Sequence, residues 1–224
     1  DVALHRLPVI FCLDRAGITG DDGPSHHGIY DMALLCKVPG MRVLAPSSAQ
    51  ELQQMLHDAV TLADDGPVMI RYPKGAARQV TEHEVGTGLH ARRVRAGGPE
   101  LCVLAVGKML AASEKAAEAL AAEGLNVTVW DVRSCTPLDT DMLDDAAAHR
   151  IVITAEDGIR EGGVGMSIAD ALSNRCEPGS PCPYVEVLGV PGEFIAQAKP
   201  DVILRQVGLD ADGIAATARR LLGR

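Results

Sequence analysis

The chain alternates short apolar runs with longer segments of helical periodicity. Continuous apolar runs predict strands at residues 7–13, 41–45, 68–72, 101–106, 127–131, 151–155 and 184–188. Helical spacing predicts helices at residues 29–35, 51–63, 139–148, 164–174 and 211–222, and an alanine-rich helix ending at residue 123. Ser48 and Glu51 have the spacing of a capping box at the start of the second of these helices. Regular alternation of strand and helix predicts an α/β fold with parallel sheets and right-handed crossovers.

The alternation is interrupted once, which predicts two domains. We expect residues 1–75 to form part of one domain and residues 76–99 to form a linker, with a short strand near residues 89–94. Residues 100–224 then form a second α/β domain. The apolar run at residues 7–13 is typical of a strand that is buried on both faces and has parallel neighbours on both sides. Because only two further strands precede the linker, we expect the first domain to be completed by residues outside this chain.

Composition narrows the classes of partner. The net charge is −9 and the pI is about 5.2, which argues against a nucleic-acid partner. A few local cations could still bind an anionic substrate. No apolar run approaches the roughly 20 residues that a membrane helix needs, and the chain does not begin with the pattern of a signal peptide. We therefore expect a cytoplasmic protein with no membrane partner.

The six cysteines are scattered, and none forms a CxxC pair. They are Cys12, Cys36, Cys102, Cys135, Cys176 and Cys182. We expect them to be buried thiols in a reducing compartment. A zinc site made of Cys176, Cys182 and a distant histidine is the alternative, but no ligand spacing supports it.

The segment with the most chemistry is DRAGITGDDGPSHHG, residues 14–28. It follows a predicted strand and precedes a predicted helix, and ligands of parallel sheets bind outside the carboxyl ends of the strands. Its four glycines allow a close approach of the backbone to a ligand. Its charged and titratable side chains offer one cation for an anion and several groups for proton transfer: Arg15, Asp21, Asp22, His26 and His27. The residues alone leave two interpretations open, an anion-handling loop and a solvated polar loop.

The same segment also carries a resemblance. DRAGITGDDGPSHHGIYD, with LPVIFCLD before it and VPGMRVLAPSSAQEL and RYPKG after it, resembles the pyrimidine-binding domain of the 1-deoxy-D-xylulose-5-phosphate synthase family. From about residue 100 onward, including ITAEDGIREGGVG, the chain is similar to the transketolase-type C-terminal domain of that family. The resemblance spans essentially the whole chain. It implies an incomplete parallel-sheet pyrimidine-binding domain followed by a transketolase C-terminal-type α/β domain.

The resemblance implies a function and a set of site residues. The family uses thiamine diphosphate to condense pyruvate with glyceraldehyde 3-phosphate, which gives 1-deoxy-D-xylulose 5-phosphate and carbon dioxide for isoprenoid, thiamine and pyridoxal synthesis. Arg15 matches an arginine that binds the substrate phosphate. Lys74 stands where the family often has a second phosphate-binding arginine, so a point charge replaces a bidentate fork. Asp22 and His26 match residues that line the site of catalysis.

The resemblance also implies what this chain does not supply. The family holds the cofactor diphosphate and Mg²⁺ with a GDG…N motif, which does not occur here, and its activating glutamate would precede Asp1. It follows that thiamine diphosphate and Mg²⁺ are bound mostly by an N-terminal portion of the same enzyme, and that no residue of this chain is a metal ligand. We expect the chain to be inactive alone and the intact enzyme to be a homodimer.

Several alternatives stay open. The glycine turn EGGVG at residues 161–165 could cradle a phosphate at a helix start or could be a tight connection. Glu156 and Asp157 could be an acid–base pair or solvated turn residues. The whole chain could belong to another thiamine enzyme, such as a transketolase or the β subunit of a 2-oxoacid dehydrogenase. It could also be a non-catalytic module for dimerisation or ligand sensing.

Overall fold

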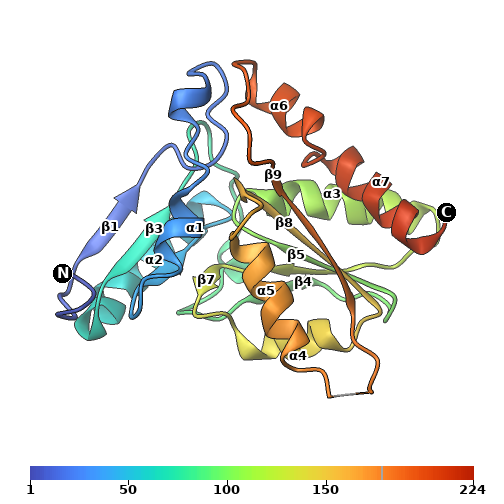
Figure 1. Ribbon diagram of the computed structural model, residues 1–224, viewed down its shortest axis with the longest axis horizontal. Coiled ribbons are helices and arrows are strands. Elements are labelled where there is room, and N and C mark those ends of the chain that lie inside the picture. The colour runs from blue at the N-terminus through green and yellow to red at the C-terminus, as the bar shows by residue number, and fades with distance from the viewer. Residues whose placement is uncertain (178) are drawn as a thin grey trace.

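Two mainly parallel sheets, each flanked by helices, form the computed structural model, which describes residues 1–177 and 179–224 (Figure 1). The first sheet has the order β1-β3-β2-β7. Its strands are β1 (Ile10–Leu13), β2 (Arg42–Leu44), β3 (Val68–Arg71) and β7 (Ser134–Thr136). β3 pairs in parallel with β1 and β2, whereas β7 is antiparallel to β2. The arrangement confirms the predicted α/β fold.

The second sheet has five strands in the order β4-β6-β5-β8-β9. They are β4 (Arg92–Arg95), β5 (Leu101–Ala105), β6 (Thr128–Asp131), β8 (Ile151–Ile159) and β9 (Tyr184–Val190). The pairs among β5, β6, β8 and β9 are parallel, and β4 is an antiparallel edge strand against β6. Thus β4 lies in the stretch that the sequence analysis treated as a linker, and it belongs to the second sheet.

Seven α-helices and three short 3-10 helices connect the strands of the described residues. The α-helices are α1 (Asp31–Leu35), α2 (Ala49–Leu62), α3 (Met109–Ala122), α4 (Thr140–Ala147), α5 (Val164–Ser173), α6 (Pro200–Gln206) and α7 (Ala211–Leu222). The 3-10 helices are η1 (Pro24–His26), η2 (Ala63–Asp65) and η3 (Glu82–Glu84). α3 and α7 cover one face of the second sheet, and α4 and α5 lie on the other (Figure 1). No helix of the described residues is long and apolar enough to span a bilayer.

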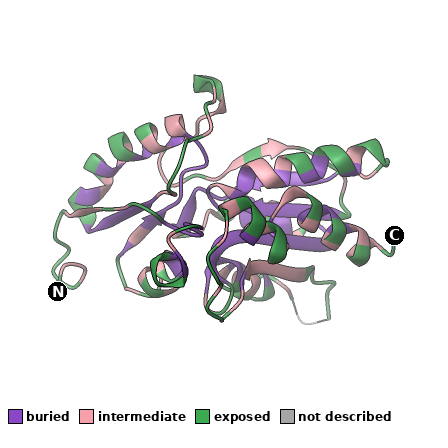
Figure 2. Cartoon of the chain, turned by 90° about the horizontal axis from the view of Figure 1, so that it is seen from above, coloured by how far each residue is buried: buried purple, intermediate pink, exposed green. Residues whose placement is uncertain are grey.

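The hydrophobic core is continuous between the two sheets. One cluster of buried side chains combines Met32, Val43 and Met69 of the first half with residues of β5, β6 and α5 in the second half. Buried residues line the centre of the molecule, and exposed residues follow the outer faces of the helices (Figure 2). Since burial of apolar surface is the main favourable term in folding, this shared core fixes the two halves relative to each other.

β1 differs from its prediction. It begins at Ile10 rather than at Leu7, it pairs only with β3 among the described strands, and Cys12 on it is exposed. Within this chain the strand is therefore not buried on both faces, and its coverage by residues outside the chain stays a prediction. An apolar run marks a segment that can be buried, but the neighbours that bury it are a property of the sheet.

The start of α2 also differs in part from its prediction. The Ser48 hydroxyl accepts a hydrogen bond from the Glu51 amide at 3.1 Å, as a capping residue should. The Glu51 carboxylate, however, does not return to Ser48. It is fully buried, and it accepts from Arg133 at 2.7 Å and from the Gly86 amide at 2.7 Å. A residue that fits a local capping pattern thus serves a contact between distant segments.

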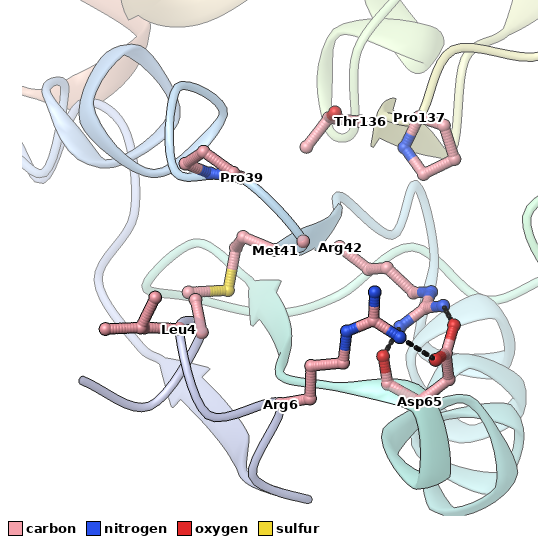
Figure 3. Close-up of a pocket in the computed structure, with 10 residues that line it drawn as sticks. Leu4, Arg6, Pro39, Met41, Arg42, Asp65, Thr136 and Pro137 are labelled. Atoms are coloured by element: carbon pink, nitrogen blue, oxygen red, sulfur yellow. Dashed lines mark hydrogen bonds and ion pairs between the residues drawn. The ribbon is translucent and has the colours of Figure 1, made fainter.

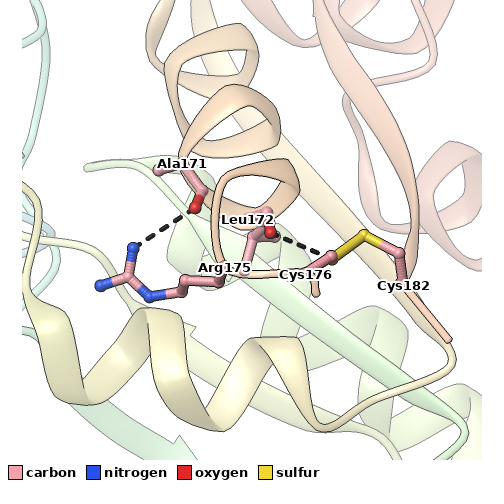
Figure 4. The surroundings of a disulfide bond; sticks show 5 residues. All are labelled: Ala171, Leu172, Arg175, Cys176 and Cys182. Carbon is pink, nitrogen blue, oxygen red and sulfur yellow. Dashed lines mark hydrogen bonds between the residues drawn. A yellow bond between two sulfur atoms is a disulfide. The ribbon is translucent and has the colours of Figure 1, made fainter. Parts of the chain in front are cut away.

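Cys176 and Cys182 form a disulfide, so the expectation of six free thiols is wrong for these two (Figure 4). The bond closes the connection between α5 and β9, and the Cys176 sulfur also lies 3.2 Å from the Leu172 carbonyl oxygen. The other four cysteines are free, but Cys12 among them is exposed rather than buried. Within residues 1–177 and 179–224, no cluster of His, Cys, Asp or Glu side chains is arranged to hold a metal ion, and the zinc alternative gains no support.

The buried Arg133–Glu51 ion pair generates a stability prediction. Both side chains are 0% exposed. Arg133 lies between β6 and β7 and Glu51 lies in α2, so the pair joins these two segments. Replacing Arg133 with Met leaves the Glu51 carboxylate buried without its cation, so we expect the free energy of unfolding to fall by about 3–5 kcal/mol in denaturant titrations. The matched control is Arg150→Met, which breaks an exposed pair with Glu100 of the same 2.7 Å length. We expect that change to cost less than about 1 kcal/mol. Equal losses in the two variants would contradict this account of the buried pair.

Candidate functional site

A closed loop follows β1 at the carboxyl edge of the first sheet. Gly17 and Gly28 exchange two backbone hydrogen bonds of 2.8 Å, which close the base of the loop. Both positions require glycine: Gly17 has φ of +75°, and a Cβ on Gly28 would lie 2.5 Å from the Arg15 carbonyl oxygen. The Ala16 amide donates to the Tyr72 carbonyl at 3.0 Å, which ties the loop to the segment after β3. In Figure 1 the loop, with η1 at its tip, stands beside the segment that enters α6.

Arg15 occupies an unusual backbone conformation at the start of this loop. Its φ is +55°, in the left-handed region that residues other than glycine seldom adopt. Its side chain is more than half exposed and contacts the neighbouring Asp14 carboxylate at 2.7 Å. Such strain commonly persists where a side chain must be held in one direction for function. The guanidinium is thus presented to solvent at the edge where ligands of parallel sheets bind.

Lys74 and Asp22 meet across the site. The Lys74 ammonium lies 2.7 Å from an Asp22 carboxylate oxygen, and both groups are partly exposed. The hydrogen bond from Lys74 lowers the pKa of Asp22, and the charges of His26 and Arg15 lower it further. The structure therefore gathers all four predicted site residues around one loop, and it joins two of them directly. Among the described residues, Arg15 and His26 form no direct contact with that pair.

The two adjacent histidines have different environments. His26 is exposed on η1, with its Nδ1 3.0 Å from the Ser25 hydroxyl. His27 is 9% exposed, and its Nδ1 accepts from the Thr19 amide at 3.2 Å. Burial lowers the pKa of His27, so this ring is neutral at physiological pH. His26 faces solvent and a ligand could reach it, whereas His27 packs into the loop.

A network of buried charges lies under the loop, and sequence reasoning missed its role. Arg71 donates to Asp157 at 2.5 Å and to Asp31 at 2.9 Å, and Lys108 forms an ion pair with Asp157 at 3.2 Å. Asp157 is fully buried within β8, which extends through Ile159 rather than ending at residue 155. The interpretation of Glu156 and Asp157 as solvated turn residues is therefore wrong. An arginine in the strand VMIR, which is otherwise apolar, was the available signal for a buried partner.

The backbone amides of the glycine turn at the start of α5 already donate to a side chain of the protein. The Glu156 carboxylate accepts hydrogen bonds from the Gly165 amide at 2.8 Å and from the Val164 amide at 3.1 Å. Burial raises the pKa of Glu156 to about 7, although these amides favour its charged form. Because a carboxylate already satisfies the helix N-terminus, the alternative of a phosphate cradle at residues 161–165 loses its donors.

Two hollows of similar size lie at opposite ends of the first sheet. One, of about 500 Å³, is lined by Arg6, Arg42 and Asp65, whose side chains converge near the amino ends of the strands (Figure 3). The other, of about 480 Å³, is lined by Lys74, Arg78 and Lys108 together with residues of α6. Ligands of parallel sheets bind at the carboxyl ends. The second hollow therefore adjoins the candidate site, and the first does not.

Two family descriptions match successive parts of the chain. Residues 1–79 match the family described as the transketolase pyrimidine-binding domain, and residues 89–214 match the transketolase C-terminal domain. The 1-deoxy-D-xylulose-5-phosphate synthase of Anaeromyxobacter dehalogenans is 45% identical over 100% of this chain and 35% of its own length. That of Thermobifida fusca is 42% identical over 96% of this chain and 34% of its own length. The chain thus spans about a third of the length of these relatives.

A solved structure shares the fold. It is described as a split gene transketolase, inactive beta4 tetramer, and it superposes with a TM-score of 0.84 at 28% identity over 98% of this chain and 68% of its own. Residues 89–214 alone make up more than half of the 224 residues. The chain belongs to the transketolase family, as a pyrimidine-binding segment followed by a transketolase C-terminal domain.

Proposed function

We propose that the complete protein of which this chain is part condenses pyruvate with glyceraldehyde 3-phosphate. The products are 1-deoxy-D-xylulose 5-phosphate and carbon dioxide. Two findings support the proposal together. Relatives that align with the whole chain bear the name of this enzyme. In addition, Arg15, Asp22 and His26 of the loop after β1 lie with Lys74, which follows β3, at the carboxyl edge of a parallel sheet. The second finding carries the assignment of residues, because two cations at such an edge suit a phosphorylated aldehyde.

The proposal gives each residue a role toward the substrates. Arg15 binds the phosphate of the aldehyde with its exposed guanidinium, and Lys74 adds a second positive charge. Asp22 holds Lys74 in place until the phosphate replaces it as the partner. His26, the exposed histidine, transfers protons near the reacting carbon atoms, since an imidazole can act as a general acid or base.

Thiamine diphosphate, when bound, supplies the electron sink that allows pyruvate to lose carbon dioxide. The proposal assigns the residues of this chain to substrate binding and proton transfer, and it assigns no metal ligand to them. In the proposal, an N-terminal portion of the same protein holds thiamine diphosphate and Mg²⁺, the protein works in the cytoplasm as a homodimer, and this chain alone is inactive. The division into residues 1–75, 76–99 and 100–224 is part of the proposal, with the difference that β4 of the middle stretch belongs to the second sheet.

A transketolase activity is the second candidate, because the similar solved structure bears that name. The complete protein separates the two candidates. Incubation with pyruvate and glyceraldehyde 3-phosphate should release carbon dioxide and yield 1-deoxy-D-xylulose 5-phosphate. Incubation with a ketose phosphate donor and an aldose phosphate should give little product. The reverse result would replace the proposed function with the transketolase reaction.

Arg15 generates the first prediction of this proposal. In the complete enzyme, Arg15→Ala should raise the KM for glyceraldehyde 3-phosphate about tenfold to a hundredfold, which is the value of a hydrogen bond to a charged group. The KM for pyruvate should change little, because pyruvate carries no phosphate. Steady-state kinetics with each substrate varied in turn make the comparison. If both constants rise equally, Arg15 supports the loop and does not bind the ligand.

Lys74 generates the second prediction. Lys74→Met should impair the use of glyceraldehyde 3-phosphate about tenfold to a hundredfold in kcat/KM. It should leave the reaction with unphosphorylated glyceraldehyde nearly unchanged, since that substrate has no charge to bind. The control Lys74→Arg keeps the cation and should retain activity. A Met variant that loses both substrates alike, or neither, would remove Lys74 from the site.

The third prediction separates the two histidines. His26→Ala should lower kcat about 100- to 10,000-fold, as is typical for a general acid or base, with smaller changes in either KM. It should leave the thermal unfolding temperature nearly unchanged, because the side chain is exposed. The control His27→Asn keeps an acceptor for the Thr19 amide. A larger loss of kcat in a stable His27→Asn protein would mean that His27, and not His26, is the proton-transfer residue.

A further inference from the structure

The substrate loop rests on a carboxylate that belongs to the second half of the chain. A Cβ placed on Gly17 would lie 1.8 Å from an Asp157 side-chain oxygen, so the loop base and this carboxylate are in van der Waals contact. Gly17 is also the residue whose backbone closes the loop by pairing with Gly28. The position of the Asp157 carboxylate therefore limits where the base of the loop can lie.

Asp157 itself is held rigidly by charge. It is fully buried, one carboxylate oxygen accepts from Arg71 at 2.5 Å, and the other lies 3.2 Å from the Lys108 ammonium. Burial opposes ionisation, yet Arg71 and Lys108 hold the pKa of Asp157 below its usual value. Asp31 contacts Arg71 from the other side at 2.9 Å, and it also accepts from the Met32 amide at the start of α1. Two cations and two carboxylates balance in this interior.

Asp157 reaches both proposed phosphate ligands along short stretches of chain. Gly17, which it contacts, is two residues after Arg15, and Arg71, which it pairs with, is three residues before Lys74. Arg15 and Lys74 follow β1 and β3, which pair in parallel, and the Ala16 amide donates to the Tyr72 carbonyl at 3.0 Å between the two segments. The Asp157 carboxylate adds a contact to both segments from the second half of the chain.

Other contacts from the second half support the same loop. A Cβ on Gly20 would lie 2.5 Å from Pro200 and 2.9 Å from the Ala198 carbonyl oxygen, at the start of α6. The Ile159 amide, two residues after Asp157, donates to the Ile29 carbonyl at 2.8 Å. These contacts are uncharged and lie at Gly20 and Ile29, whereas Asp157 contacts Gly17 at the base of the loop.

We propose that Asp157 is a positioning residue, which acts through Gly17 and Arg71 and, together with the backbone bond from Ala16 to Tyr72, sets the spacing of Arg15 and Lys74 so that both can contact one phosphate. The inference rests on the proposed function for the identity of the ligand. It assigns to the transketolase C-terminal domain a specific part in substrate selection. Asp157 does not contact the substrate, and its effect is transmitted through the two anchors.

The test is Asp157→Asn in the complete enzyme, which conserves side-chain volume and removes the charge. Arg71 and Lys108 then lose their shared anionic partner, and the side chain beneath Gly17 is held less firmly, although the backbone bonds of the loop base remain. The KM for glyceraldehyde 3-phosphate should rise about tenfold or more, with the KM for pyruvate and the reaction of unphosphorylated glyceraldehyde changed by less than about threefold. The control Asp170→Asn, an exposed change on α5, should alter none of these values.

Hydrogen exchange of the peptide covering residues 14–28 gives a second measurement that does not depend on the reaction. In folded Asp157→Asn protein, exchange in this loop should be about tenfold faster, while β5 and β6 keep their protection. If Asp157→Asn does not fold, the second variant is Asp31→Asn, which weakens the same network at Arg71. This variant should also raise the KM for glyceraldehyde 3-phosphate more than the KM for pyruvate. It should also speed loop exchange, and both effects should be smaller.

The outcomes separate the two proposals. A wild-type enzyme that does not form the product would overturn the proposed function, and loop exchange would still report on Asp157. An active, folded variant whose two KM values and loop exchange match the wild type would overturn the positioning role. Equal rises in both KM values, with unchanged loop exchange, would do so as well.

Discussion

The ion pair between Arg71 and Asp157 is the interaction on which the arrangement of the site depends. Arg71 is the last residue of β3 in the first sheet, and Asp157 lies in β8 of the second, so the pair joins the two halves of the fold. Both side chains are almost completely buried. Removing charges from water is costly, and loss of either member leaves the other with one ionic partner in place of two, Asp31 for Arg71 or Lys108 for Asp157. The two sheets are therefore locked in one relative position at the edge where the loop emerges.

Further polar contacts between the halves follow the same principle. The Arg133–Glu51 pair and the 2.5 Å hydrogen bond from Ser47 to Asp131 both connect the first half to the second. Burial raises the pKa of Asp131 to about 7, which reflects how little water reaches this interface. β7 extends the first sheet although it comes from the second half of the chain. The C-terminal domain is thus an integral support of the candidate site rather than an appended module.

Sequence patterns predicted the elements well and their partners poorly. Apolar runs located β3, β5 and β6 to within two residues, and glycine at position 124 marked the end of α3, where its φ is +82°. These features depend on local properties, namely burial of a short run and the conformational freedom of one residue. β7 and α6 were missed, because β7 has only three residues and α6 is a short helix that begins with a proline.

The candidate site shows the same difference between features that the sequence predicts and contacts that only the folded chain creates. The family resemblance predicted site roles for Arg15, Asp22, His26 and Lys74, and these residues lie around one loop. It did not identify Asp157, because a charged pair at the end of an apolar run is normally a turn signal. Only the distant cations Arg71 and Lys108 allow Asp157 to be buried, and their proximity is a property of the folded chain. The disulfide between Cys176 and Cys182 was likewise not predicted, since no spacing rule pairs two cysteines across a loop.

The most direct test is a crystal structure of the complete protein with glyceraldehyde 3-phosphate bound. The account predicts that the phosphate lies within hydrogen-bond distance of both Arg15 and Lys74, that Lys74 has left Asp22, and that Asp157 still pairs with Arg71 beneath Gly17. A phosphate bound away from this loop, with Lys74 still held by Asp22, would contradict it.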